Sequence, residues 1–211
     1  MRFLALLLAA LVCAGTARAA TVRVVTLAPA DDVSFPFWCS WGYDWEERCY
    51  RLDGARLGVG GGEPDKVWRA AVRFSTAALP PGATLVTAEL SLFYDGVCVA
   101  PRKQSRPCDG RAFDFGLHPI FTPRWYAERE VEFGPQVGFA SLPALARPQW
   151  LTWDVTDVVA DWASGGLENN GLLLKLVDAE EAFGVSGPLF PSSRAADAAV
   201  RPRLTVWYVP A

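Results

Sequence analysis

Residues 68–74 read Trp-Arg-Ala-Ala-Val-Arg-Phe, and residues 88–94 read Ala-Glu-Leu-Ser-Leu-Phe-Tyr. In both stretches every second side chain is apolar, and Arg69, Arg73 and Glu89 stand between them. A period of two predicts β-strands that place one face on a core and the other toward water. These two stretches therefore favour an all-β fold.

The same alternation recurs toward the end of the chain, in residues 151–155 and 203–208. Residues 172–177 form a more continuous apolar run, which follows the turn signal Asn170-Gly171 and predicts another strand. Glycine and proline clusters separate the predicted strands, most clearly at 60–62, 80–82 and 165–166.

One short helix is expected after residue 155. Thr156 is expected to cap it, and Gly165 or Gly166 to end it. Its apolar face carries Val158, Val159 and Trp162. Many short strands with one small helix predict a jelly-roll β-sandwich. Since no linker or internal repeat is visible, residues 20–211 are expected to form a single domain.

Residues 1–19 have the pattern of a signal peptide. Arg2 supplies a charge, an apolar run follows, and Ala17-Arg18-Ala19 has the form of a cleavage site, so the exported chain should start near Ala20. No later segment is apolar enough to predict a transmembrane helix. The protein is expected to be secreted or held at the cell surface.

The charge balance argues against nucleic acid as a partner. The chain has 20 basic and 23 acidic residues, and loss of Arg2 and Arg18 with the leader leaves a net charge of −5. Phosphate backbones require a basic face. Catalysis is not expected either, because no G-x-S-x-G or H-E-x-x-H motif is present and His118 is the only histidine.

Four cysteines remain after the leader: Cys39, Cys49, Cys98 and Cys108. An even number in an exported chain predicts disulfides. Three connectivities exist, and the equal short spacing within each pair favours Cys39–Cys49 and Cys98–Cys108. A zinc site is the rival interpretation, but the sequence lacks the C-x-x-C spacing typical of one.

An aromatic row precedes and crosses the first cysteine pair. Every second position from 33 to 45 holds an apolar side chain, namely Val33, Phe35, Phe37, Cys39, Trp41, Tyr43 and Trp45. In an extended chain these side chains share one face, and aromatic faces can stack on flat ligands such as sugar rings. Trp41, Tyr43 and Trp45 are therefore candidate ligand-binding residues. Burial of the same face in the core is the alternative.

The second cysteine loop is basic. Arg102, Lys103 and Arg106 lie inside it, and they are candidate contacts for an anionic polysaccharide. A solvated hairpin tip is the alternative interpretation.

Asp31 and Asp32 are adjacent acidic residues and candidate ligands for a structural calcium ion. No other cofactor is predicted. Calcium takes six or more oxygen ligands, so other groups would have to complete the site. Asp154 and Asp157 flank the predicted helix start, where capping and turn formation account for them.

The order of short motifs resembles the DNRLRE-domain family, which is related to the disaggregatase repeat. The resemblance runs from about Ala30 to Val209. It rests on Leu57-Gly58-Val59-Gly60, Arg69-x-x-x-Arg73-Phe74, Leu79-Pro80-Pro81-Gly82-Ala83, Ala88-Glu89-Leu90, Trp125, Asp154-Val155-Thr156, Asn170-Gly171-Leu172, Ser193-Arg194 and Arg201-Pro202-Arg203-Leu204.

That resemblance implies a jelly-roll module of secreted and cell-surface bacterial or archaeal proteins, similar to a carbohydrate-binding module family that has alginate as a ligand class. It also implies that the acidic pair at 31–32 opens the first core strand. The cysteine-bearing segments Pro36–Tyr50 and Val97–Cys108 look like insertions into the family pattern.

The sequence thus leads to a non-catalytic, exported module that binds extracellular or cell-surface polysaccharide. A structural or adhesive cell-surface protein that contacts another protein is the alternative. A secreted glycan-active enzyme is a third hypothesis, because paired carboxylates leave no signature in sequence spacing.

Overall fold

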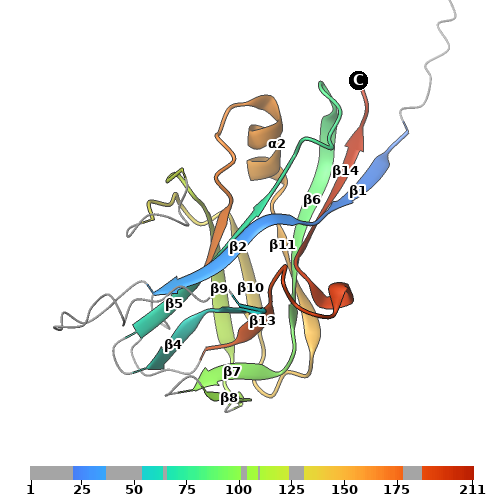
Figure 1. Cartoon of the computed structure of the whole chain (residues 1–211). Coiled ribbons are helices and arrows are strands. Elements are labelled where there is room, and N and C mark those ends of the chain that lie inside the picture. Colours follow the sequence, from blue (N-terminus) through green and yellow to red (C-terminus); the bar gives the residue numbers. More distant parts are fainter. Residues whose placement is uncertain are drawn as a thin grey trace, which may run out of the picture.

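The computed structural model describes residues 21–36, 54–63, 66–100, 104–108, 110–123, 131–177 and 187–211 (Figure 1). In these ranges the regular structure is antiparallel β-strand with one short α-helix, which confirms the predicted all-β fold. The strands are β1 Arg23–Leu27, β2 Pro29–Pro36, β3 Arg56–Gly58, β4 Gly60–Glu63, β5 Lys66–Phe74, β6 Thr84–Tyr94, β7 Val97–Ala100, β8 Gln104–Pro107, β9 Phe113–Pro119, β10 Gly138–Leu142, β11 Gln149–Asp154, β12 Leu172–Leu176, β13 Leu189–Pro191 and β14 Arg203–Val209; the helices are α2 Thr156–Ser164 and the 3₁₀ turn η2 Ala198–Val200.

Two sheets form the sandwich. The first has the order β1-β14-β6-β11, and the second has the order β10-β9-β12-β5-β2, with β4 also paired to β5. The predicted alternation is confirmed in both: the inward positions of β5, β6, β11 and β14 are buried, including Phe74, Leu90 and Trp153. Strand β12 lies between β9 and β5 and is buried along its whole length, which explains its continuous apolar run.

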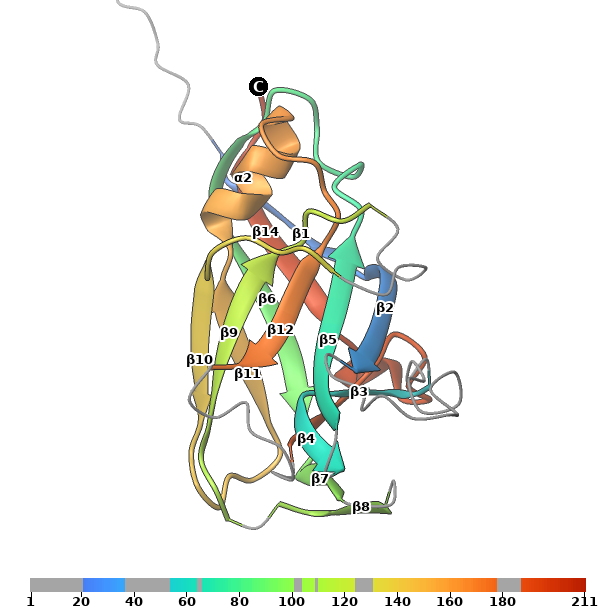
Figure 2. The same cartoon turned by 90° about the vertical axis from the view of Figure 1, so that its left-hand side faces the viewer.

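The pairing of eight strands is nested. Strand β1 pairs with β14, β5 with β12, β6 with β11, and β9 with β10. The first of these eight strands in chain order thus pairs with the last, and each inner pair repeats the pattern. This is a long hairpin rolled into two facing sheets, the jelly-roll arrangement that the sequence predicts (Figure 2).

Helix α2 covers one end of the sandwich, opposite β7 and β8 (Figure 1). Its buried face is Val158, Val159 and Trp162, and Gly165 ends it in a left-handed conformation, both as predicted. The predicted cap at Thr156 is wrong, because Thr156 is the first helical residue. The Asp154 carboxylate instead accepts from the Thr156 amide and hydroxyl, while the Thr156 hydroxyl accepts from the Ala88 amide on β6.

The predicted disulfide between Cys98 and Cys108 is present, with a Cα–Cα distance of 5.0 Å. It closes the hairpin of β7 and β8, in which Cys98 is the register partner of Arg106. The Tyr94 hydroxyl donates to Cys108 Sγ at 2.9 Å. Burial, and secondarily the charge of Asp95, raises the pKa of Tyr94, so this donor stays protonated at neutral pH.

The outer face of the second sheet is partly covered by chain. Val33, Ala71 and Leu173 form a small second core with Ile120, against which Val131 and Phe133 pack. Arg69, which the alternating pattern places toward water, is only 4% exposed, and its guanidinium lies 5.3 Å from the Phe133 ring centroid. The expectation of a solvated face is therefore wrong at this position, because the loop after β9 folds back over the sheet.

Candidate functional site

Most of the ligand-binding residues predicted from the sequence lie outside the described residues. This holds for Trp41, Tyr43 and Trp45, for Arg102 and Lys103, and for the cysteine pair Cys39 and Cys49. The backbone of Arg106 is part of β8. Val33, the first member of the aromatic row, is buried on the outer face of the second sheet. The ligand roles of these residues stay predictions.

Asp32 is a buried carboxylate on β2, and its neighbours come from the segment after β13. The amide and the hydroxyl of Ser193 both donate to it, the hydroxyl at 2.8 Å. The Arg194 guanidinium lies 3.4 Å from the carboxylate and also donates to the Asp32 carbonyl at 2.8 Å. Both carboxylate oxygens are therefore occupied by protein donors.

Asp31 points to the opposite side of β2 and lies 3.6 Å from Arg73 on β5. The two adjacent carboxylates thus contact different residues, Asp32 the segment after β13 and Asp31 the neighbouring strand β5. Within the described part of the chain, no three His, Cys, Asp or Glu side chains gather as a metal site would require. A calcium ion at Asp31 and Asp32 stays a prediction.

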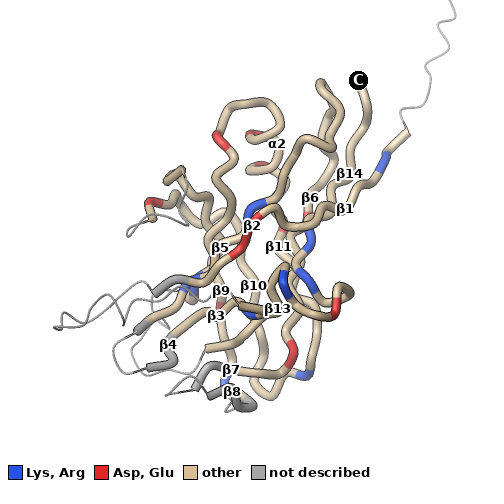
Figure 3. The backbone as a smooth tube through the Cα atoms, viewed as in Figure 1, with Lys and Arg blue, Asp and Glu red and all other residues tan. Residues whose placement is uncertain are grey.

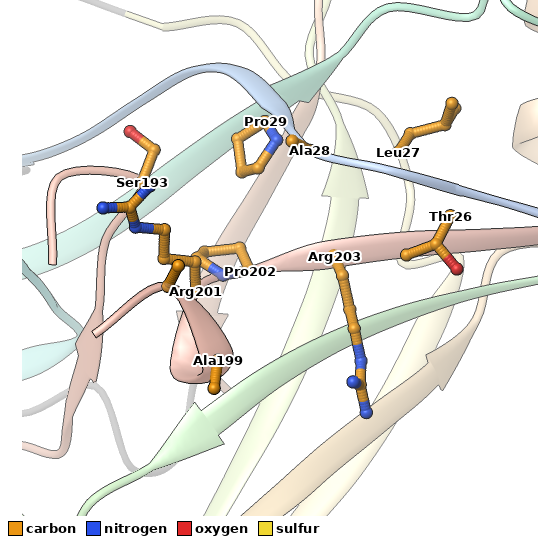
Figure 4. Close-up of a pocket in the computed structure, with 10 residues that line it drawn as sticks. Thr26, Leu27, Ala28, Pro29, Ser193, Ala199, Arg201, Pro202 and Arg203 are labelled. Carbon is orange, nitrogen blue, oxygen red and sulfur yellow. The ribbon is translucent and has the colours of Figure 1, made fainter. Parts of the chain in front are cut away.

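An open groove of about 440 Å³ lies where the chain crosses from the first sheet to the second (Figure 4). One wall is the end of β1 and the start of β2, and the other is Ser193 with η2 and the start of β14. The lining residues are Thr26, Leu27, Ala28, Pro29, Ser193, Ala198, Ala199, Arg201, Pro202 and Arg203. The lining therefore contains two arginines and no acidic residue.

The two arginines are held in different ways. Arg201 donates from Nε and Nη2 to the Ala195 carbonyl, at 2.9 and 2.7 Å. Arg203 stacks on Trp150 of β11, with Cζ 3.9 Å from the ring centroid. Figure 4 shows the Arg201 side chain running toward Ser193, while that of Arg203 turns away from it. Their guanidinium groups therefore point away from each other.

The outward face of the first sheet continues from the groove. Trp150 and Phe93 are register partners on β11 and β6, and their rings meet edge to face with centroids 5.4 Å apart. Trp207 lies on the same face and is partly exposed, whereas Trp68, Trp153 and Trp162 are buried. Hydroxyl pairs lie between these aromatic residues, Thr26 with Thr205 and Ser91 with Thr152.

Sequence reasoning missed this face although the signal was present. Since Leu151 and Trp153 face the core, a period of two places Trp150 and Thr152 outward. For the groove, the sequence offered only the Arg201-Pro202-Arg203 motif. The wall formed by Thr26, Leu27, Ala28 and Pro29 lies far from this motif in the sequence, so the motif alone does not predict a groove.

His118 has a structural neighbourhood on the outer side of β9. Its Nδ1 lies 2.9 Å from the Gly134 carbonyl oxygen, and its ring meets Phe133 edge to face. Because a carbonyl only accepts, Nδ1 carries the proton in this contact. These contacts hold the loop after β9 against the sheet.

None of the helices in the described ranges combines the length and the apolar character needed to cross a membrane. No family model matches the chain, and no curated protein matches it. The resemblance to the DNRLRE-domain family therefore stays a prediction.

Proposed function

We propose that the chain is an exported, non-catalytic β-sandwich module that binds extracellular or cell-surface polysaccharide. The observation that carries this proposal is the outward face of the first sheet, where Trp150, Phe93 and Trp207 stand partly exposed among hydroxyl side chains. Sugar rings present apolar C–H faces and hydroxyl edges, so a surface of this composition matches both.

The spacing of the two tryptophans suits an extended ligand. Trp207 is the register partner of Thr87, and Trp150 that of Phe93, on the same strand β6. Six residues of strand separate these two rows, about 20 Å at the usual rise of a strand. Because both lie on a rigid sheet, little ordering free energy is lost when a chain of sugars lies along it.

A protein-contact function has an observation of its own. Val22, Val24 and Val86 are 50%, 58% and 51% exposed at one corner of the first sheet. Exposed apolar residues gathered at one place are typical of surfaces that meet a partner. They favour the alternative of a structural or adhesive protein, which the same experiment separates from sugar binding.

Affinity electrophoresis of the protein from residue 20 onward, in gels containing neutral or acidic polysaccharides, tests the proposal. We expect retardation in at least one gel, and expect Trp150→Ala and Trp207→Ala to reduce it while circular dichroism shows that both variants still fold. Phe139→Ala is the matched control, because Phe139 is 53% exposed on the other sheet. Unretarded migration in every gel would contradict sugar binding and leave the protein-contact alternative.

A second pair of variants tests the aromatic row that the sequence predicts. If Trp41→Ala and Trp45→Ala abolish retardation while Trp150→Ala does not, sugar binding stands but its surface is the cysteine-linked insertion. If Trp150→Ala alone abolishes it, the outward face of the first sheet is the binding surface.

A further inference from the structure

Strand β1 forms an unprotected edge of the first sheet. In the described part of the chain its one neighbour is β14, which pairs with all five of its residues. The outer edge of such a strand carries unpaired amide and carbonyl groups, and proteins usually block it with prolines, charges or bulges. Residues 22–28 contain no proline, the register of β1 on β14 is regular, and the one charge, Arg23, stands at the first position of the strand.

The other edges of the two main sheets are protected. Strand β2 begins with Pro29 and ends with Pro36, carries Asp31 and Asp32, and shifts its register on β5 near its start. The edges formed by β10 and β11 lie against each other, where the two sheets meet. In Figure 3 the tube is tan along β1 beyond its basic start, whereas β2 carries an acidic stretch. The open edge of β1 is therefore the exception.

An apolar patch adjoins this edge on the outward face of the sheet. Val22 and Val24 are exposed, and Val24 is the register partner of the partly exposed Trp207. Val86 is exposed as well, because it lies at the register shift between β6 and β14 and has no partner on β14. A bulge re-aims a side chain in this way. An apolar patch beside an open strand edge is typical of surfaces that accept a further strand.

We propose that β1 pairs with β1 of a second copy of this chain, antiparallel and about a twofold axis, so that two four-stranded sheets join into one. A twofold axis requires a surface that is complementary to itself. With the axis at Val24, Val24 meets Val24 of the second copy, and Val22 meets Thr26. These are pairs of β-branched residues, which stabilise antiparallel strands.

The charges of β1 favour a second copy as the partner. The outward positions 22, 24 and 26 are uncharged and β-branched, so a matching strand should be uncharged and β-branched there, and β1 is itself such a strand. Arg23 would stand opposite Val25 of the second copy, so that no like charges are directly opposed.

The size of the contact predicts a weak dimer. Five paired residues span about 17 Å, and so short an edge buries less than the roughly 800 Å² per partner of a stable complex. The valines of the two patches meet across the axis and add apolar area that the edge alone lacks. We therefore expect a dissociation constant of about 10–100 μM.

Pairing of this kind would also double the outward face. Because the axis is perpendicular to the joined sheet, both copies present their Trp150–Phe93 pairs on the same side. A long ligand could then contact both copies at once, which raises the overall affinity without a new contact. This consequence rests on the proposed polysaccharide binding, whereas the pairing itself does not.

Sedimentation velocity of the protein from residue 20 onward, at concentrations from about tenfold below to about tenfold above this dissociation constant, tests the pairing. We expect monomers to convert to dimers and to nothing larger, because a twofold contact closes on itself. Val24→Lys should weaken the dimer at least about tenfold, since it places two ammonium groups opposite each other on the strand edge. Circular dichroism checks that the variant folds.

Two matched variants separate strand pairing from other contacts. Phe139→Lys makes the same kind of change at an exposed residue of the other sheet and should leave the dimer intact. Val86→Lys alters the apolar patch on β6, which lies inside the sheet, so edge pairing should survive it, whereas stacking of two patches face to face should not.

Hydrogen exchange of the wild type reports on the strand itself and needs no variant. Every second amide of β1 points away from β14, and these amides should exchange more slowly as the protein concentration rises. If Val24→Lys does not fold, this measurement decides alone.

Four results would overturn the proposal: monomers at every concentration, a dimer that Val24→Lys leaves unchanged, a dimer without protection of the β1 amides, and growth beyond the dimer. Affinity electrophoresis of wild type and Val24→Lys in one polysaccharide gel tests the consequence for binding, with stronger retardation expected for the wild type. Absence of retardation for both would remove the polysaccharide function, while a dimer seen in sedimentation would still establish the pairing.

Discussion

The carboxylate of Asp32, buried on β2, accepts hydrogen bonds from both the amide and the hydroxyl of Ser193. The two residues lie near opposite ends of the chain, and their contact fastens the edge of the second sheet to the segment that leads into η2. Ser193 also lines the groove. This contact therefore holds one wall of the candidate binding site in place.

Replacing Asp32 should cost much more stability than replacing its neighbour. Asp32→Ala leaves the Ser193 amide and hydroxyl without an acceptor and Arg194 without its counter-charge, so we expect a loss of about 3 kcal/mol. Asp31→Ala is the control, because its partly exposed pair with Arg73 is expected to contribute about 1 kcal/mol or less. Urea unfolding of both variants measures the difference, and equal losses would contradict the bracing role.

Removing the disulfide of the β7–β8 hairpin should lower stability without changing the fold. The bridge joins residues ten positions apart, and closing so short a loop is expected to contribute about 2–3 kcal/mol through the unfolded state. The double variant Cys98→Ser and Cys108→Ser should show this loss in urea unfolding. Peptide mapping of the unreduced protein should yield a Cys98–Cys108 peptide, and a Cys39–Cys98 peptide would contradict the pairing.

The hydrogen bonds at the start of α2 should make stability depend on pH. The Thr156 hydroxyl, and secondly its amide, lower the pKa of Asp154 in the folded state. Such a group stabilises the fold fully above its ordinary pKa, and the contribution is lost as the pH falls through the lowered folded value. Because Asp154 is exposed, we expect less than about 1 kcal/mol.

Unfolding free energies of the wild type and of Asp154→Asn should therefore differ at pH 7 and converge near pH 2. Thr156→Ser keeps both donors and should retain the wild-type pH profile. A difference between wild type and Asp154→Asn that persists unchanged at low pH would show that charge at Asp154 is not involved.

The β-sandwich could be predicted because the alternation of apolar and polar residues is visible within the sequence of each single strand. Alternation in β5, β6, β11 and β14 reports which side of each strand meets the core, whatever the strand pairs with. The buried run of β12 is predictable for the same reason. The pairing Cys98–Cys108 follows from spacing, since short loops close most readily.

The groove and the covered outer face depend instead on contacts between distant segments. Arg69 occupies a polar position of the alternating pattern, yet it is buried, with its guanidinium beside the Phe133 ring that the loop after β9 brings over the sheet. Likewise, Thr26 and Arg203 line one groove because β1 pairs with β14. A period-two pattern carries no information about which distant strand becomes a neighbour.

Two glycines, Gly165 directly after α2 and Gly171 directly before β12, should differ sharply in their tolerance of a side chain. Both have positive φ, 96° at Gly171 and 78° at Gly165. A Cβ on Gly171 would lie 2.6 Å from the Val72 carbonyl oxygen on β5, while one on Gly165 would meet nothing within 4 Å. We expect Gly165→Ala to cost about 1 kcal/mol through the backbone alone, and Gly171→Ala to cost at least about 2 kcal/mol because β12 and β5 must separate locally. Urea unfolding compares the two variants, and hydrogen exchange of the β12 amides should accelerate in Gly171→Ala only. Equal costs would mean that the turn before β12 can move away from β5 without strain.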